Sequence, residues 1–187
     1  MLDKLNQSYF SPYFIFIKEG FNLLDKDILL RLGLDEYQLV TDEKERNKEI
    51  LSKRYLFLTE DTNWTCLMDD WLGGMWFNKE IRSRKKILSK DFEIYTCGIQ
   101  DYGFDFAYFK DGEIRRQYVV DNRKIIVDIG SPLAIESIAL QKKDPYDKVI
   151  AIAEFLGIKL NYEKEKVRIY GRQENEMEMN FFNDDEY

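Results

Sequence analysis

The stretch from Phe92 to Val120, FEIYTCGIQDYGFDFAYFKDGEIRRQYVV, predicts the fold class. Three segments in it, 92–99, 104–109 and 114–120, are rich in β-branched and aromatic residues, which favour strands. The residues Lys110-Asp111-Gly112-Glu113 between the last two segments are typical of a hairpin turn. Strands joined by such short turns pair antiparallel, so this stretch predicts the centre of an antiparallel sheet.

Further strands are predicted on both sides of this centre. Residues 13–17 form a continuous β-favouring run, YFIFI, and residues 125–129 can add an edge strand. Residues 54–59 and 64–68 read as a second hairpin through Glu60-Asp61-Thr62-Asn63. With the helices described next, these segments predict an α+β fold: an antiparallel sheet of about five to seven strands, with helices packed on one face.

Four helices are expected. The first spans 22–32 and ends at Gly33, and the last has Asp144 as its N-cap, Pro145 in its first turn and Gly157 after its end. A short helix is expected from Pro132 through residue 140. The fourth, 78–89, is strongly basic, and its apolar residues Ile81, Ile87 and Leu88 predict a narrow buried stripe beneath a solvated cationic face.

Composition bounds the organisation and the chemistry of the chain. Its 187 residues, of which 44% are apolar, suffice for one sizeable core, so we expect a single domain over residues 1–171. The chain contains no histidine. This excludes Ser-His-Asp and Cys-His nucleophile systems, histidine metal sites and the usual acid-base group near neutral pH.

Charge is unevenly distributed along the chain. The formal net charge is −7, and residues 172–187, with six acidic residues and one arginine, contribute −5 of it. We call this segment the acidic tail and expect it to be solvated and flexible; the alternative is that it attracts a basic partner. Residues 79–90 carry +5. Nucleic-acid binding by this basic segment is not expected, because the chain as a whole is acidic.

The two cysteines and the N-terminus indicate a compartment. Cys66 and Cys97 are too few and too far apart for a disulfide framework or a zinc site, so reduced core thiols are expected, although neighbouring strands would allow them to pair. No segment resembles a signal peptide or a membrane span. A cytoplasmic protein without a cofactor is the resulting expectation.

Candidate catalytic chemistry is sparse. Several aspartates could supply carboxylates for a divalent metal, but no spacing matches a metal-binding loop, and turn or edge positions are the favoured interpretation. These residues are Asp69, Asp70, Asp101, Asp105, Asp121 and Asp128. The glycines of Gly73-Gly74, and of Gly98 and Gly103, lack the Lys-Ser/Thr of a phosphate-binding loop. Neither catalytic residues nor metal ligands are therefore assigned.

Aromatic residues supply the candidates for partner binding. Tyr and Trp are the residue types most enriched at binding hot spots, and two tryptophans flank the diglycine at 73–74. The candidate partner-binding residues combine these aromatics with residues of the acidic tail. They are Trp71, Trp76, Phe77, Tyr102, Glu174, Glu176, Phe181 and Phe182.

One family resemblance is carried by short motifs across residues 13–157. They are the Trp-led strand from Trp64, Asp111-Gly112-Glu113 followed by Arg115-Arg116, and Gly130-Ser131-Pro132-Leu133 followed by Glu136. In this order the motifs resemble small α+β immunity proteins of bacterial polymorphic toxin systems. The resemblance implies a cytosolic protein that neutralises a toxin by occluding it, without catalysis, and it transfers no functional residue.

The expected function is therefore non-catalytic inhibition of a toxin or effector through direct protein–protein binding. An acidic binder would associate with a basic target faster at low salt. Three alternatives remain open: a phage-type anti-defence binder, a small-ligand sensor with a cleft beside 71–76, and an aspartate-based metal-dependent hydrolase.

Overall fold

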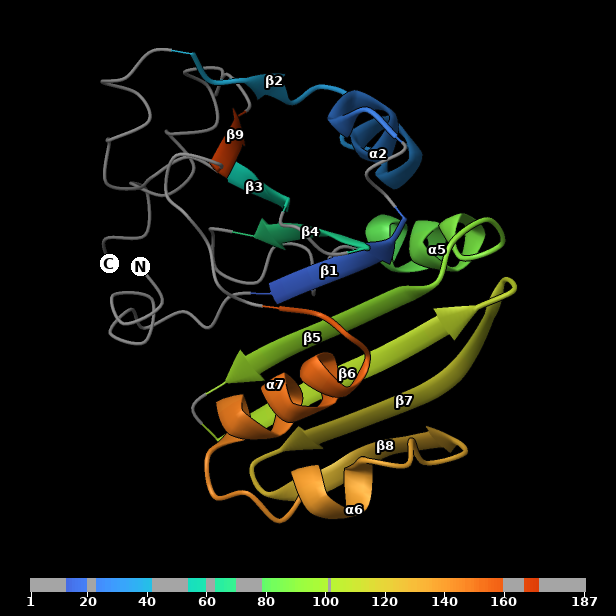
Figure 1. Ribbon diagram of the computed structural model, residues 1–187, viewed down its shortest axis with the longest axis vertical. Helices are drawn as coiled ribbons and strands as arrows, with labels where there is room; N and C mark the ends of the chain where they lie inside the picture. Colours follow the sequence, from blue (N-terminus) through green and yellow to red (C-terminus); the bar gives the residue numbers. More distant parts are fainter. Residues whose placement is uncertain are drawn as a thin grey trace, which may run out of the picture.

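The computed structural model describes residues 13–19, 23–41, 54–59, 63–69, 79–100, 102–159 and 167–171 (Figure 1). These residues build one large sheet with helices against it. The strands are β1 (Tyr13–Lys18), β2 (Gln38–Leu39), β3 (Arg54–Thr59), β4 (Trp64–Asp69), β5 (Ile94–Gln100), β6 (Gly103–Lys110), β7 (Glu113–Asp121), β8 (Lys124–Gly130) and β9 (Val167–Gly171). The helices are α2 (Asp25–Leu32), α5 (Lys79–Leu88), α6 (Glu136–Ala139) and α7 (Pro145–Phe155).

The sheet is antiparallel throughout, in the order β2-β9-β3-β4-β1-β5-β6-β7-β8. The predicted α+β class with a large antiparallel sheet is thus confirmed. The described residues contribute nine strands, more than the five to seven expected. The two unpredicted strands, β2 and β9, have only two and five residues, too few for a clear alternation of apolar and polar positions.

The helix ends follow the local signals in the sequence. Gly33 ends α2 in the left-handed conformation, with φ 76°. The Asp144 side chain accepts a hydrogen bond from the Tyr146 backbone N–H at 2.7 Å and caps α7, whose first residue is Pro145. The short helix α6 begins only at Glu136, so the turn from Pro132 onward is not part of it.

Helices pack against both faces of the sheet, so the expectation of helices on one face is wrong. On one face Phe14, Phe16 and Tyr95 pack with α7, which lies in front of β5 and β6 in Figure 1. On the other face Ile15 and Ile17 pack with α2 and α5. Successive side chains of β1 therefore point into two different cores. Because both faces of the strand are buried, its sequence is apolar without interruption.

The basic helix α5 packs differently from its predicted stripe. Ile81 and Leu88 are buried as expected, but Ile87 is 62% exposed and Lys85 is buried. The Lys85 ammonium donates to the Tyr13 hydroxyl at 2.6 Å and lies 4.9 Å from the centre of the Tyr13 ring. Residues 81, 85 and 88 are four and three positions apart and so share one helix face, from which residue 87 is rotated away.

Candidate functional site

The structure describes one of the eight candidate partner-binding residues. Tyr102 lies in the turn between β5 and β6 and is 65% exposed. The other seven, Trp71, Trp76, Phe77, Glu174, Glu176, Phe181 and Phe182, lie outside the described residues. The acidic tail and the suggested cleft beside 71–76 lie outside them as well, so these assignments stay predictions.

The candidate aspartates do not converge where they are described. Asp105 is buried in β6, Asp121 is exposed at the end of β7, and Asp128 in β8 pairs with an arginine. Asp70 and Asp101 lie outside the described residues, as does the side chain of Asp69. Among the residues described, no three His, Cys, Asp or Glu side chains are placed to hold a metal ion.

Two glycines considered for phosphate binding instead allow close strand packing. A Cβ atom on Gly98 would lie 2.6 Å from the Asp105 carboxylate and 2.8 Å from the Tyr13 ring. A Cβ atom on Gly103 would lie 2.3 Å from the Val120 carbonyl oxygen. Both positions exclude a side chain for steric reasons, which accounts for the glycines without a ligand.

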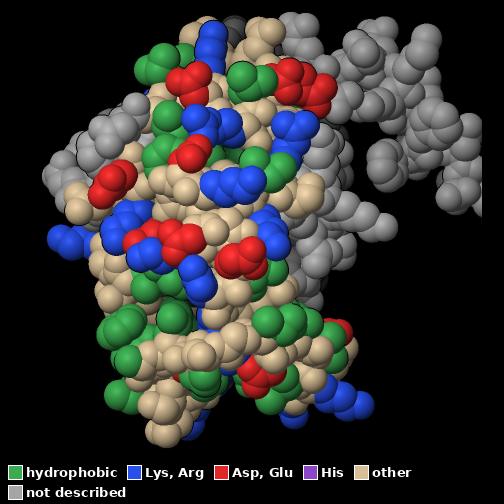
Figure 2. Space-filling model, turned by 90° about the vertical axis from the view of Figure 1, so that its right-hand side faces the viewer, with side chains coloured by type: hydrophobic (Ala, Val, Ile, Leu, Met, Phe, Trp, Pro, Cys, Tyr) green, Lys and Arg blue, Asp and Glu red, His purple; other side chains and the backbone are tan. Residues whose placement is uncertain are grey.

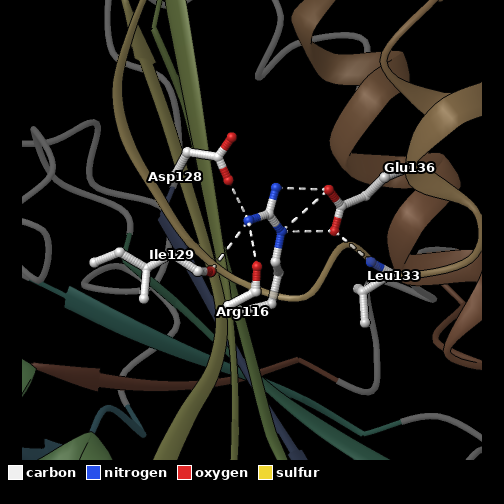
Figure 3. Close-up of polar contacts among 6 residues, drawn as sticks. Arg116, Asp128, Ile129, Leu133 and Glu136 are labelled. Carbon is white, nitrogen blue, oxygen red and sulfur yellow. Dashed lines mark hydrogen bonds and ion pairs between the residues drawn. The ribbon is translucent and has the colours of Figure 1, made fainter.

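The most enclosed polar cluster centres on Arg116 of β7 (Figure 3). Its guanidinium donates to both carboxylate oxygens of Glu136 in α6, with Nε–Oε1 at 2.9 Å and Nη2–Oε2 at 2.8 Å. Nη1 donates to the Asp128 carboxylate and, at 3.1 Å, to the Ile129 carbonyl. The Leu133 backbone N–H donates to Glu136 at 2.7 Å. The cluster thus ties β7, β8 and α6 together.

Arg116 and Glu136 are 2% and 3% exposed. Because water has little access to them, nearly all of their polar atoms must hydrogen-bond to other protein groups. Burial opposes the charged guanidinium, but the hydrogen bonds to Glu136 and Asp128 raise the pKa of Arg116 above its ordinary value. The guanidinium also lies 5.2 Å from the centre of the Tyr118 ring. The Arg116 guanidinium therefore holds β7, β8 and α6 in place, and its hydrogen bonds leave it little freedom to act on a substrate.

A second polar network surrounds Glu93, immediately before β5. Its carboxylate accepts hydrogen bonds from Tyr108 Oη at 2.7 Å, Lys110 Nζ at 2.8 Å and Lys18 Nζ at 3.2 Å. Partial burial would raise the pKa of Glu93, but these donors outweigh it and lower the pKa to about 2. Burial and the bond to Glu93 raise the pKa of Tyr108. The network joins β1, β5 and β6 through side chains.

Beside this network is a pocket of about 210 Å³, lined mainly by charged residues. Figure 2 views the molecule from this side and shows positive and negative side chains interleaved across its middle. Asp91 pairs with Arg31, Asp111 with Arg115, and Glu93 with two lysines. Five of the seven charged residues that line the pocket are therefore already engaged in ion pairs.

The β5–β6 turn, which contains Tyr102, is hydrogen-bonded to the β7–β8 turn. The Arg123 backbone N–H donates to the Tyr102 carbonyl at 3.3 Å, which joins the β5–β6 turn to the β7–β8 turn. Asn122 and Arg123 have φ values of 47° and 63°, the left-handed geometry of a tight two-residue hairpin. Tyr102 is consequently an exposed aromatic side chain on a hydrogen-bonded backbone at one end of the sheet.

The two cysteines lie on different strands and are not joined in a disulfide. Cys66 lies in β4 and Cys97 in β5, and β1 runs between these two strands. Two strand spacings amount to about 10 Å, beyond the reach of a disulfide. Because the strands are not neighbours, the condition for a Cys66–Cys97 pair is not met, and both thiols are buried in the core beneath α7.

The Arg116 and Glu93 clusters were not predicted from the sequence. Arg115 and Arg116 are adjacent and look equivalent in sequence, yet strand alternation sends Arg116 inward, two residues before the buried Tyr118. The two-residue spacing between Arg116 and Tyr118 could therefore have indicated that Arg116 points inward. The partners of Glu93 come from two other strands, β1 and β6, and no local pattern could have indicated them.

No family model, curated protein or solved structure matches this chain. None of the helices in the described part of the chain is long and apolar enough to cross a membrane.

Proposed function

We propose that this chain is a non-catalytic inhibitor that neutralises a toxin or effector protein by binding it directly, as an immunity protein does. The observation that carries the proposal is Tyr102, an aromatic side chain 65% exposed on a turn fixed by a hydrogen bond to the adjacent hairpin. Exposed tyrosines on rigid backbone bind proteins well, because little conformational entropy is lost on association.

The polar clusters are consistent with a binding role. The Arg116 and Glu93 clusters join strands and helices, and their side chains are already hydrogen-bonded within the fold. Such clusters hold a surface in one shape, which lowers the cost of binding. Absence of histidine from the chain also removes the commonest acid-base catalyst.

The partner in this proposal is a cytoplasmic toxin or effector. A basic partner would be attracted by the acidic tail, so association should slow as salt rises. A phage-type anti-defence protein would use the same contacts against a different partner. The identity of the captured protein separates these two roles.

The test co-expresses the chain with each protein encoded by the adjacent genes and retains any of these proteins that arrests growth when expressed alone. The chain should restore growth and form a complex, and Tyr102→Ala should weaken that complex about thirtyfold, the loss that corresponds to the lower limit for a hot-spot residue. Phe155→Ala is the matched control, since Phe155 is an exposed aromatic at the end of α7. Growth that is not restored by the wild-type chain would contradict the proposal.

A further inference from the structure

The two edges of the sheet differ in length. At one edge, β2 has two residues, a length that offers little backbone for another strand to pair with. At the other edge, β8 has seven residues, and within the described ranges no strand pairs with its outer side. It forms the lower edge of the sheet in Figure 1. The unpaired backbone of β8 is therefore long enough to bind another strand.

The β8 edge is also apolar. Ile125 and Ile126 are each 59% exposed, and Ile129 is 50% exposed. Ile126 lies at a bulge and has no Cα partner on β7, because Ile125 pairs with Val120 and Val127 with Val119. A long edge strand with exposed isoleucines is costly in a free monomer, since it favours pairing with other chains. Covering it would stabilise the protein.

Opposite charges lie at the two ends of β8. At its beginning, Asp121, Arg123 and Lys124 give a net charge of +1. At its end, Arg116, Asp128 and Glu136 form the cluster of Figure 3, with a net charge of −1. Arg116 and Glu136 are buried, so the Asp128 side chain, which is 54% exposed, presents this negative charge to solvent. When two copies of β8 run antiparallel, the beginning of each strand lies beside the end of the other. The strand is thus complementary in charge to a second copy of itself.

We propose that two copies of this chain associate through β8, antiparallel, so that their sheets become continuous across a two-fold axis. Charge complementarity favours a second copy as the occupant, because one strand supplies both signs in the order that antiparallel pairing requires. Closed two-fold dimers, in which the same patch is used twice, are the commonest oligomers. This inference is independent of the proposed function.

The first test measures the mass of the chain in solution by light scattering coupled to gel filtration. The expected mass is about twice the 22.5 kDa of one chain. Ile126→Lys should shift the protein to the monomer, because it places a charge in the apolar contact of both copies. Ile87→Lys, an equally exposed isoleucine on α5, should leave the dimer intact. A wild-type monomer, or a dimer that survives Ile126→Lys, overturns the proposal.

The second test addresses the antiparallel orientation. Lys124→Glu changes the charge at the beginning of β8 from +1 to −1, so that it repels the end of the other copy. The dimer dissociation constant should rise about tenfold. Lys90→Glu, the same change after α5, should not alter it. Equal constants for these two variants would overturn the charge argument, and with it the antiparallel assignment.

The Ile126→Lys variant also separates this inference from the proposed function. A monomeric variant that still neutralises the toxic protein is the result expected, because Tyr102 belongs to the β5–β6 turn, beside the beginning of β8, whereas Ile126 lies within β8 itself. Failure of the wild-type chain to neutralise, with the dimer intact, would count against the function alone. A monomeric wild-type chain that neutralises would count against the dimer alone.

Discussion

Arg116 shows how strongly one side chain can depend on its surroundings. A guanidinium that is 2% exposed has lost nearly all of its hydration, and the carboxylates of Glu136 and Asp128, together with the Ile129 carbonyl, compensate for this loss. Its neighbour Arg115 is exposed and pairs with Asp111 on the surface. Two adjacent arginines of the same strand therefore differ widely in what they contribute to stability.

This contrast predicts different effects of the same substitution. Arg116→Met should lower the free energy of unfolding by about 3–5 kcal/mol, because it leaves the Glu136 carboxylate buried without its partner. Arg115→Met should change it by less than about 0.5 kcal/mol. Urea unfolding followed by circular dichroism measures both. The double variant Arg116→Met, Glu136→Met should recover much of the loss, and no recovery would contradict the role given to the pair.

Glu93 predicts a dependence of stability on pH. Its pKa is about 2 in the folded protein against an ordinary value of 4.5, so the folded state binds its proton less readily than the unfolded state. The stabilisation is therefore complete above pH 4.5 and is lost as pH falls toward 2. Glu93→Gln should cost about 1 kcal/mol at neutral pH, because it weakens the contacts with two partly exposed lysines.

Unfolding curves across this pH range check the prediction for Glu93. The difference in stability between wild type and Glu93→Gln should narrow as pH falls from 4.5 to 2. Glu113→Gln serves as a control, since Glu113 makes only an exposed ion pair with Lys86 at 3.6 Å. A difference that stays constant with pH would show that Glu93 does not titrate as described.

At the scale of the element, the end of α2 and both ends of α7 were predicted well, whereas α2 and α6 begin later than predicted, at Asp25 and Glu136, and helix faces were predicted less well. Asp144, Pro145, Gly33 and Gly157 mark ends through their own backbone and side-chain chemistry, which needs no distant partner. The buried face of α5 could not be found from residue type, since it includes Lys85 and omits Ile87. Its position was nevertheless available from spacing, because residues 81, 85 and 88 repeat at the helical period.

The cap of α7 provides a prediction for an element. Asp144→Ala should lower the free energy of unfolding by about 1 kcal/mol, since the Tyr146 backbone N–H loses its acceptor. For a chain of this size the loss corresponds to a melting temperature lower by about 2–4 °C. Asp144→Asn should retain most of the stability, because asparagine caps helices nearly as well. Equal melting temperatures for the Ala and Asn variants would show that capping is not the cause.

For the whole molecule, the decisive feature is β1, which pairs with β4 and β5 and lies between two cores. The run YFIFI was recognised as a strand, but its lack of alternation also indicates that both of its faces are covered. Helices on both faces could thus have been predicted. The order of the strands could not, because it depends on pairings between segments far apart in the sequence. The partners of Glu93 were unpredictable for the same reason.

The position of the two cysteines within this architecture predicts their reactivity. Both thiols are buried beneath α7, on the two strands that flank β1, and burial raises the pKa of the Cys97 thiol. Because the thiolate is the reactive form, neither cysteine should react with a disulfide reagent until the core opens. Opening this core requires separation of α7 from the centre of the sheet, which amounts to unfolding of the molecule.

Labelling of the thiols at increasing urea concentrations tests this prediction for the whole molecule. Both cysteines should become reactive together, at the midpoint at which circular dichroism reports loss of the sheet. Ile87→Cys provides the control, since an exposed thiol on α5 should react at once in native buffer. If Cys66 or Cys97 became reactive well below the unfolding midpoint, the core beneath α7 would open separately from the core beneath α2 and α5. The sheet would then not unfold as a single cooperative unit, because one of its two helical layers would separate before the strands do.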